Sequence, residues 1–381
     1  MRFAWFIVAG ALFACGPLTP PMMDAGQGGG AATGGGSATG GGGAATGGGS
    51  ATGGGSATGG GVATGGGTGV DAGMPTWRFS TLSVNVVTSN AGQIVGIGEN
   101  DAGVWAMSSY GRLFQSTGGP FNEVLALKET DGSAYQPSDF VIASSGRMFI
   151  VTTRWVGSCA SDCANQANWT FDDHNVAATA LRSLCVVDDN HVLALGETGS
   201  GNEGVAYRWT GTELNLNVIP LAVDSPGRCV KSVHGDFIIP GQNGVLRYEP
   251  GLQSFTSSSS TSQLTWRYAG SVDGHEWIFA SGPRIAEEVG SVWTDTQYIN
   301  GQNTIRAVIG ASPTLVWGFG GAMSSSSQKL WKFDGTRWSA VTPDLSGFYQ
   351  VHVAFKAGDG TIYFGGESAI LEVGMGRAVL R

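Results

Sequence analysis

Four arginines and a histidine recur at nearly the same place in consecutive segments of the chain. Each lies nine to eleven residues before the second residue of a short apolar strand. They are Arg182, Arg228, Arg267, Arg306 and His352, before Leu193, Phe237, Trp277, Trp317 and Tyr363. An arginine guanidinium is a planar fork of donors that suits carboxylate or phosphate. If the five side chains converge, they predict an anion-binding site in a chain whose formal net charge is -9.

A structural role for these arginines is the alternative. In that case each guanidinium pairs with an acidic group or a backbone carbonyl of the neighbouring repeat and binds no ligand. A binding site requires the side chains to converge on one face and to stay partly open to solvent. The sequence leaves both interpretations open.

Three histidines also align, at the turn that follows the arginine-bearing strand. They are His191, His234 and His275, accompanied by Asp188, Asp189, Asp236 and Asp273. Three histidines on one rim would suit zinc. However, tight turns prefer Asp, Asn and Gly, and neighbouring turns can lie too far apart to share an ion. We therefore predict no metal and no cofactor.

Known catalytic patterns are missing. The Gly-x-Gly-x-x-Gly match at residues 199–204 joins two strands instead of opening a helix. His275-Glu276 is followed by Phe279 where a zinc protease has its second histidine, and no Gly-x-Ser-x-Gly elbow occurs. We predict no catalytic residue. The alternative is a glycan hydrolase or lyase, which paired carboxylates beside the arginines would favour.

The elements that position these residues are seven short apolar strands. Their second residues are Trp105, Phe149, Leu193, Phe237, Trp277, Trp317 and Tyr363, spaced by 44, 44, 44, 40, 40 and 46 residues. Such a period is typical of propellers, whose four-stranded repeats cannot bury their faces alone. We predict an all-β, seven-bladed β-propeller of antiparallel blades over residues 77–381. Its inner strands would bring the arginines to one mouth of the central channel.

The ends of this domain suggest how the ring closes. The last repeat offers strands at residues 351–355, 361–364 and 369–373, and then only the short segment 377–380. Residues 77–82 read as an outer strand without a blade of its own. Pairing them into the seventh blade would leave no open sheet edge. In the second blade, residues 157–163 predict an insertion or a strapped loop.

One repeat carries a family resemblance. Residues 181–197 read Leu-Arg-Ser-Leu-Cys-Val-Val-Asp-Asp-Asn-His-Val-Leu-Ala-Leu-Gly-Glu. This resembles the repeat of the photosystem II assembly-factor-like propellers, relatives of the sialidase Asp-box repeats. Residues 116–119, Ser-Thr-Gly-Gly, keep the glycines of an Asp-box hairpin and lack its aspartate. The resemblance implies a scaffold or binding module.

The N-terminal fifth of the chain predicts that the protein is exported from the cytoplasm. Residues 1–14 contain Arg2 and a twelve-residue apolar run, the length of a signal-peptide core. Leu-Phe-Ala-Cys at residues 12–15 resembles the lipobox of bacterial lipoproteins, which implies a lipid on Cys15; an ordinary secretory signal is the alternative. Residues 15–76 are mostly imperfect Ala-Thr-Gly-Gly-Gly-Ser repeats and predict a disordered tether. We expect a lipid-anchored protein of a Gram-negative outer membrane.

Without Cys15, four cysteines remain in an oxidising compartment, which allows three pairings. We predict Cys159–Cys163, which closes a local loop, and Cys185–Cys229, which joins neighbouring inner strands.

Charged residues make up only 13% of the chain, which argues against nucleic acid as a partner. We expect a monomer that binds an envelope or extracellular protein or glycan, and that meets the membrane only through its lipid.

Overall fold

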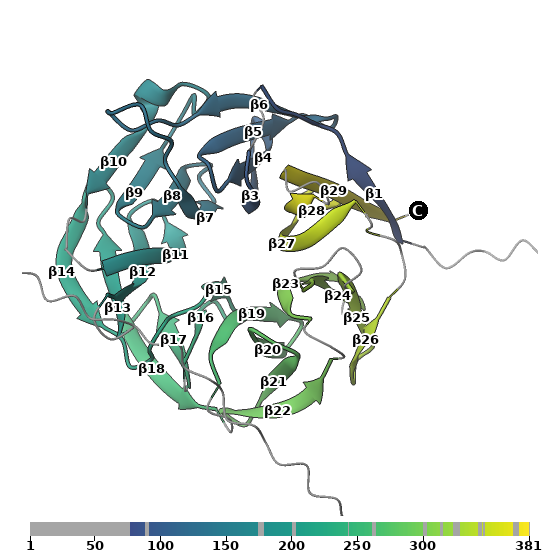
Figure 1. Cartoon of the computed structure of the whole chain (residues 1–381). Coiled ribbons are helices and arrows are strands. Elements are labelled where there is room, and N and C mark those ends of the chain that lie inside the picture. Colours follow the sequence, from purple (N-terminus) through teal and green to yellow (C-terminus); the bar gives the residue numbers. More distant parts are fainter. Residues whose placement is uncertain are drawn as a thin grey trace, which may run out of the picture. The chain divides into compact units, whose positions relative to one another are not determined.

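The described part of the chain forms a ring of seven β-sheets, the blades of a propeller (Figure 1). This computed structural model describes residues 77–87, 91–173, 179–199, 203–242, 244–260, 264–299, 303–312, 315–322, 328–341, 345, 347–368 and 373–380. Its one helical element within those ranges is the 3₁₀ turn η1 (Gln166–Asn168). The predicted seven-bladed, all-β fold is confirmed.

Blades A to D follow each other around the ring, each from inner to outer strand. Blade A has β3 (Ile94–Asn100), β4 (Gly103–Ser108), β5 (Arg112–Ser116) and β6 (Phe121–Ala126). Blade B has β7 (Pro137–Ile142), β8 (Met148–Thr152), β9 (Trp155–Cys159) and β10 (Thr170–Asp173). Blade C has β11 (Thr179–Asp188), β12 (His191–Thr198), β13 (Gly204–Trp209) and β14 (Leu214–Pro220). Blade D has β15 (Val230–Lys231), β16 (Phe237–Gly241), β17 (Gly244–Glu249) and β18 (Ser254–Ser259).

Blades E to G complete the ring. Blade E has β19 (Trp266–Val272), β20 (His275–Ala280), β21 (Arg284–Val289) and β22 (Val292–Tyr298). Blade F has β23 (Ile305–Ser312), β24 (Leu315–Gly320), β25 (Leu330–Phe333) and β26 (Trp338–Ala340). Blade G has β27 (Phe348–Lys356), β28 (Ile362–Ser368) and β29 (Val373–Leu380), with β1 (Trp77–Leu82) outside them.

Each pair of neighbouring blades encloses its own core. The described residues contain seven hydrophobic clusters, and each joins the facing sides of two successive blades. Between blades E and F, for example, Trp277 and Phe279 meet Trp331, Phe333 and Trp338. Because an inner blade strand is covered on both sides, its apolar residues do not alternate with polar ones.

The N-terminal strand closes the ring, as predicted. β1 pairs antiparallel with β29 from Trp77 opposite Leu380 to Leu82 opposite Met375, and it lies at the outer edge of blade G (Figure 1). The ring of Phe79 packs edge-on against Trp317 of blade F, with 5.1 Å between ring centroids. Blade G is therefore built from both ends of the domain.

The predicted strands of blade G need correction. Residues 369–373 were expected as the third strand and residues 377–380 as a short fourth, but one continuous strand, β29 (Val373–Leu380), is the third. Residues 369–372 lie outside the described residues. Two glycines of this strand make room for aromatic rings. A Cβ atom on Gly374 would lie 2.9 Å from the Phe348 ring, and one on Gly376 would lie 2.4 Å from the Phe364 ring.

Three blades depart from the regular pattern. In blade A, β2 (Val84–Asn85) adds a parallel strand beside β6. In blade B, the expected irregularity begins later than predicted, because Gly157 and Ser158 belong to β9 and only the loop after Cys159 is unusual. In blade D, the inner strand β15 has only two residues. Blade D therefore depends on its neighbours to hold the segment that carries Arg228.

Candidate functional site

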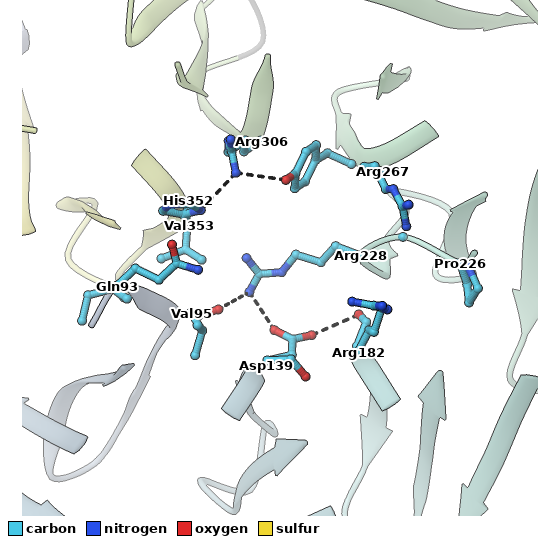
Figure 2. Close-up of a pocket in the computed structure, with 15 residues that line it drawn as sticks. Gln93, Val95, Asp139, Arg182, Pro226, Arg228, Arg267, Arg306, His352 and Val353 are labelled. Carbon is cyan, nitrogen blue, oxygen red and sulfur yellow. Dashed lines mark hydrogen bonds and ion pairs between the residues drawn. The ribbon is translucent and has the colours of Figure 1, made fainter. Parts of the chain in front are cut away.

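All five residues of the predicted anion site line one cavity of about 330 Å³ at the centre of the ring (Figure 2). Arg182, Arg267, Arg306 and His352 lie in β11, β19, β23 and β27, and Arg228 lies two residues before β15. Arg267 and Arg306 are the second residues of their strands, whereas His352 is the middle residue of β27. Because every inner strand runs from the same mouth of the channel, equal positions in the repeat become neighbours in space.

Arg228 extends across this mouth and is tied to two other blades (Figure 2). One of its Nη atoms lies 2.9 Å from a carboxylate oxygen of Asp139 in β7 and donates to the Val95 carbonyl of β3 at 3.1 Å. The Asp139 side chain is 2% exposed and also accepts from the Ser183 hydroxyl and the Leu184 N–H of β11. Arg228 and Asp139 therefore join blades A to D, which matches the structural alternative.

Sequence reasoning missed Asp139. It precedes Phe149 by ten residues, the same offset that identified the arginines. The repeat alignment thus contained the signal, but a search for basic residues passed over the one acidic member of the series.

Arg182 also has a carboxylate partner. Its Nε donates to Glu197 of β12 at 2.9 Å, and its Nη2 contacts the same oxygen. The Arg182 side chain is 51% exposed, so this pair lies at the rim of the mouth. A surface ion pair of this kind contributes only about 0–1 kcal/mol, and it does not prevent the guanidinium from facing a ligand as well.

Arg267 and Arg306 differ from the other two arginines. Among the described residues, no carboxylate lies within ion-pair distance of either. Arg267 donates to the Ser225 carbonyl at 3.3 Å. Arg306 donates to the Tyr268 hydroxyl at 3.1 Å and contacts His352 Nδ1 at 3.2 Å. Within the described part of the chain, both charges are therefore held by neutral acceptors.

His352 is a neutral member of the site. Burial, followed by the positive charges of Arg306 and Arg228, lowers the pKa of His352 to about 3. A guanidinium can only donate, so Nδ1 of His352 accepts from Arg306 and the ring proton resides on Nε2. The histidine orients Arg306 without adding a charge.

The mouth is consequently positive within an acidic chain. Counting the residues that the structure describes, four arginines face two carboxylates, Asp139 in the lining and Glu197 behind Arg182, which leaves an excess of two positive charges. A concave site with one sign of charge concentrates oppositely charged ligands even where the total charge is of the other sign.

The aligned histidines do not converge. His191 pairs with Asp188 of its own turn at 2.9 Å, and His275 pairs with Glu287 of β21 at 2.6 Å. Within the described ranges, no group of three or more His, Cys, Asp or Glu side chains is arranged to hold a metal ion. The turn preferences of these residues explain their recurrence.

Both predicted disulfides are present in the structure. Cys159–Cys163 closes the loop after β9, with Cα atoms 5.8 Å apart, and Cys185–Cys229 links β11 to the segment before β15, with Cα atoms 5.5 Å apart. The second bond lies beside the mouth, since Cys229 follows Arg228 directly.

The predicted signal peptide, Cys15 and the tether lie outside the described residues. In the described part, no helix has the length and apolar character to cross a membrane.

Comparison with known proteins shows the fold. No family model and no curated protein matches the chain. The solved structure of YCF48 bound to D1 peptide is 16% identical, with a TM-score of 0.54 over 80% of this chain and 96% of that one. The WD40 propeller domain of Doa1 is 11% identical, with a TM-score of 0.56 over 80% and 97%.

A third similar structure is the extracellular domain of the putative hybrid two-component system BT4673 from B. thetaiotaomicron. It is 12% identical, with a TM-score of 0.55 over 79% of this chain, which spans 40% of its length. The structural neighbours thus include YCF48, a photosystem II assembly factor, and all three are β-propellers. At these identities they establish the architecture, and the function has to be argued from the site.

Proposed function

We propose that this protein is a binding module that takes an anionic group of a protein or glycan into the arginine-lined mouth and performs no chemistry on it. The observation that carries this proposal is the pair Arg267 and Arg306, two partly buried cations without a carboxylate among the described residues. A bound carboxylate, sulfate or phosphate would complete their coordination with charge-assisted hydrogen bonds.

The distribution of acids favours binding over hydrolysis. Glycan hydrolases need two carboxylates beside the substrate. Among the described residues that line the mouth, Asp139 is the one carboxylate, and it is bonded to Arg228, Ser183 and Leu184. One similar propeller, YCF48, was solved with a bound peptide, which supports a protein as one class of partner.

The test is binding of two acidic probes, polygalacturonate and a poly-aspartate peptide, to the purified protein by isothermal titration calorimetry. A charge-assisted hydrogen bond contributes about 1.5–3 kcal/mol, so Arg267→Ala and Arg306→Ala should each weaken the bound probe roughly ten- to a hundred-fold. The matched control is Arg284→Ala in β21, which removes an arginine paired with Asp295 away from the mouth. If neither probe binds, or if Arg284→Ala weakens binding equally, the mouth is not the site.

We further propose that the ring is presented as a monomer outside the cytoplasm by a lipid on Cys15 and the glycine-rich tether. The two disulfides support this placement, because such bonds persist in oxidising compartments. Intact-mass analysis of the native protein tests it. A chain that begins at Cys15 with added acyl groups is expected, and a retained signal or a free Cys15 would overturn the proposal.

A further inference from the structure

The inner strands share a β-bulge that decides which side chains reach the arginine-lined mouth. In six of the seven blades, one residue of the inner strand is bypassed in the pairing with the second strand. These residues are Val95, Ser138, Arg182, Arg267, Arg306 and His352, and all six line the central cavity. A bulge re-aims the side chain of its extra residue. One position in each of these blades therefore determines what the mouth presents to a ligand.

Basic side chains occupy this position on one side of the ring. The bulge carries valine in blade A and serine in blade B, but Arg182, Arg267 and Arg306 in blades C, E and F. Arg228 of blade D precedes the short strand β15 and extends across the mouth to blades A and B (Figure 2). The arginines that can face a ligand are therefore those of the bulges.

Two of these arginines present donors that the described part of the chain does not use. Arg306 uses one Nη atom for the Tyr268 hydroxyl and His352, and Arg267 uses one for the Ser225 carbonyl. The other Nη atom of each has no partner among the described residues, and neither belongs to the fully enclosed polar atoms. Tyr268 lines the same cavity, and because its oxygen accepts from Arg306, its O–H can donate in turn.

The carboxylate of the mouth has no capacity left for a ligand. One oxygen of Asp139 accepts from Arg228 and from the Phe140 N–H. The other accepts from the Ser183 hydroxyl and the Leu184 N–H. These four bonds fill the acceptor positions of a carboxylate. A ligand that carries an acidic proton therefore finds no carboxylate to accept it among the described lining residues, which favours a fully ionised ligand.

The excess of two positive charges selects the kind of anion. Among the described residues, Arg182 and Arg228 each have a carboxylate partner, which leaves the charges of Arg267 and Arg306. A carboxylate or a sulfate monoester brings one negative charge. A phosphate monoester brings about 1.5 to 2 at pH 7, together with three strong acceptor oxygens. It matches both the charge and the donors of the lining.

We propose, on the basis of the binding function proposed above, that the anionic group in the mouth is a phosphate monoester held by Arg267, Arg306 and the Tyr268 hydroxyl. The same group occurs on sugars and on protein side chains, and the recognition chemistry is shared by both.

The experiment compares three minimal anions, methyl phosphate, methyl sulfate and acetate, by calorimetry with the full chain at pH 7. Methyl phosphate should bind at least about tenfold more tightly than the other two. Equal affinity for methyl sulfate or acetate would overturn the proposal. Glucose 6-phosphate and O-phosphoserine then distinguish the carriers, since the tighter of the two identifies the source of the phosphate. Failure of both to bind would also overturn the proposal.

Arg267→Gln tests whether the charge excess causes the preference. It lowers the excess from two charges to one, so methyl phosphate should bind about tenfold more weakly and its advantage over methyl sulfate should shrink. Tyr268→Phe keeps the ring and should weaken methyl phosphate by a similar factor. The matched control, Arg284→Gln in β21, removes an arginine paired with Asp295 and should change neither affinity. An unchanged preference in Arg267→Gln would contradict the proposal.

The pH dependence separates ionisation of the ligand from ionisation of the mouth. The second pKa of a phosphate monoester is about 6, so methyl phosphate should bind about tenfold more weakly at pH 5 than at pH 7. Methyl sulfate keeps its single charge over this range and reports any change in the protein. The titratable groups of the lining are Asp139, Tyr268 and His352, beside the four arginines. Equal weakening of both ligands would mean that the mouth itself titrates, against the proposal.

A wrong phosphate assignment and a wrong binding function give different results. If polygalacturonate or poly-aspartate binds in the mouth and methyl phosphate does not, the mouth takes carboxylates and only the phosphate assignment is wrong. If no anion of either set binds, both proposals are wrong.

Discussion

At the scale of single residues, the role of each arginine is decided by its neighbours and not by its place in the repeat. Arg228 meets a buried carboxylate and becomes a link between blades, whereas Arg306 meets a tyrosine hydroxyl and a neutral histidine. Removing Asp139 would leave the Arg228 guanidinium without its ion-pair partner. An unpaired charge in a partly buried site lowers the stability of the fold. The same residue type thus serves structure at one position and, in our proposal, binding at the next.

His352 makes the stability of the protein depend on pH. In the unfolded chain it protonates near 6.5, but in the folded protein its pKa is about 3, so the unfolded state alone takes up a proton between these values. The contribution of His352 to the free energy of unfolding is therefore fully present above about pH 6.5. Below that pH, the free energy of unfolding falls by up to about 1.4 kcal/mol per pH unit. His352→Gln should remove this loss, which amounts to about 2 kcal/mol between pH 7 and pH 5.

Urea unfolding of both proteins at pH 7 and pH 5 measures the difference. The groups that face His352, namely Arg306 and Arg228 with its partner Asp139, are the same in both, so their contributions cancel. An identical pH dependence in the two proteins would show that His352 protonates near its ordinary pKa in the folded state.

At the scale of elements, the inner segment of blade D is held from outside. β15 makes only two ladder pairs with β16. The Cys229 N–H donates to Ser183 Oγ at 3.0 Å and the Arg228 N–H donates to the Arg267 carbonyl at 2.9 Å, while Cys185–Cys229 joins the segment covalently to β11. The neighbouring blades thus replace the hydrogen bonds that a full inner strand would make within its sheet.

The two disulfides should differ in their contribution to stability. Loop-closure entropy predicts about 4 kcal/mol for Cys185–Cys229, which spans 44 residues, and about 2 kcal/mol for Cys159–Cys163, which spans four. The double variants Cys185→Ala/Cys229→Ala and Cys159→Ala/Cys163→Ala should lower the free energy of unfolding in that order. Denaturant unfolding without reductant measures both. The reverse order would mean that the local loop, and not blade D, limits stability.

At the scale of the whole molecule, the ring is stable because each blade is covered by two others, and β1 completes the last blade from the far end of the domain. Without β1, β29 would be an open edge ready to pair with another chain. The aromatic contact between Phe79 of β1 and Trp317 ties this closure to blade F as well as to blade G.

Alternate residues of β1 should therefore respond differently to truncation. Phe79 is half-buried and Arg78 is exposed. Phe79→Ala should lower the free energy of unfolding by about 2–3 kcal/mol, below the range for fully buried rings. Arg78→Ala, the control on the same strand, should change it by less than about 0.5 kcal/mol. Equal effects in urea titrations would show that the inward face of β1 does not hold the ring closed.

The sequence by itself determined the architecture and the convergence of the arginines. Both follow from a period: strands that recur every 40–46 residues become blades, and equal positions in the repeat meet at one mouth. The predicted strand boundaries were wrong in blades B and G. In blade G, the segments predicted as a third and a fourth strand belong to the single strand β29, where Gly374 and Gly376 leave room for the rings of Phe348 in β27 and Phe364 in β28.

Only the tertiary structure decided which cations are already neutralised. Asp139 reaches Arg228 across 89 residues of sequence, and no local pattern distinguishes that arginine from Arg267 or Arg306. Electrostatic pairing and cavity shape depend on distances of a few ångströms between segments that are far apart in the sequence. The repeat period that determines the fold, in contrast, can be read directly from the order of residues.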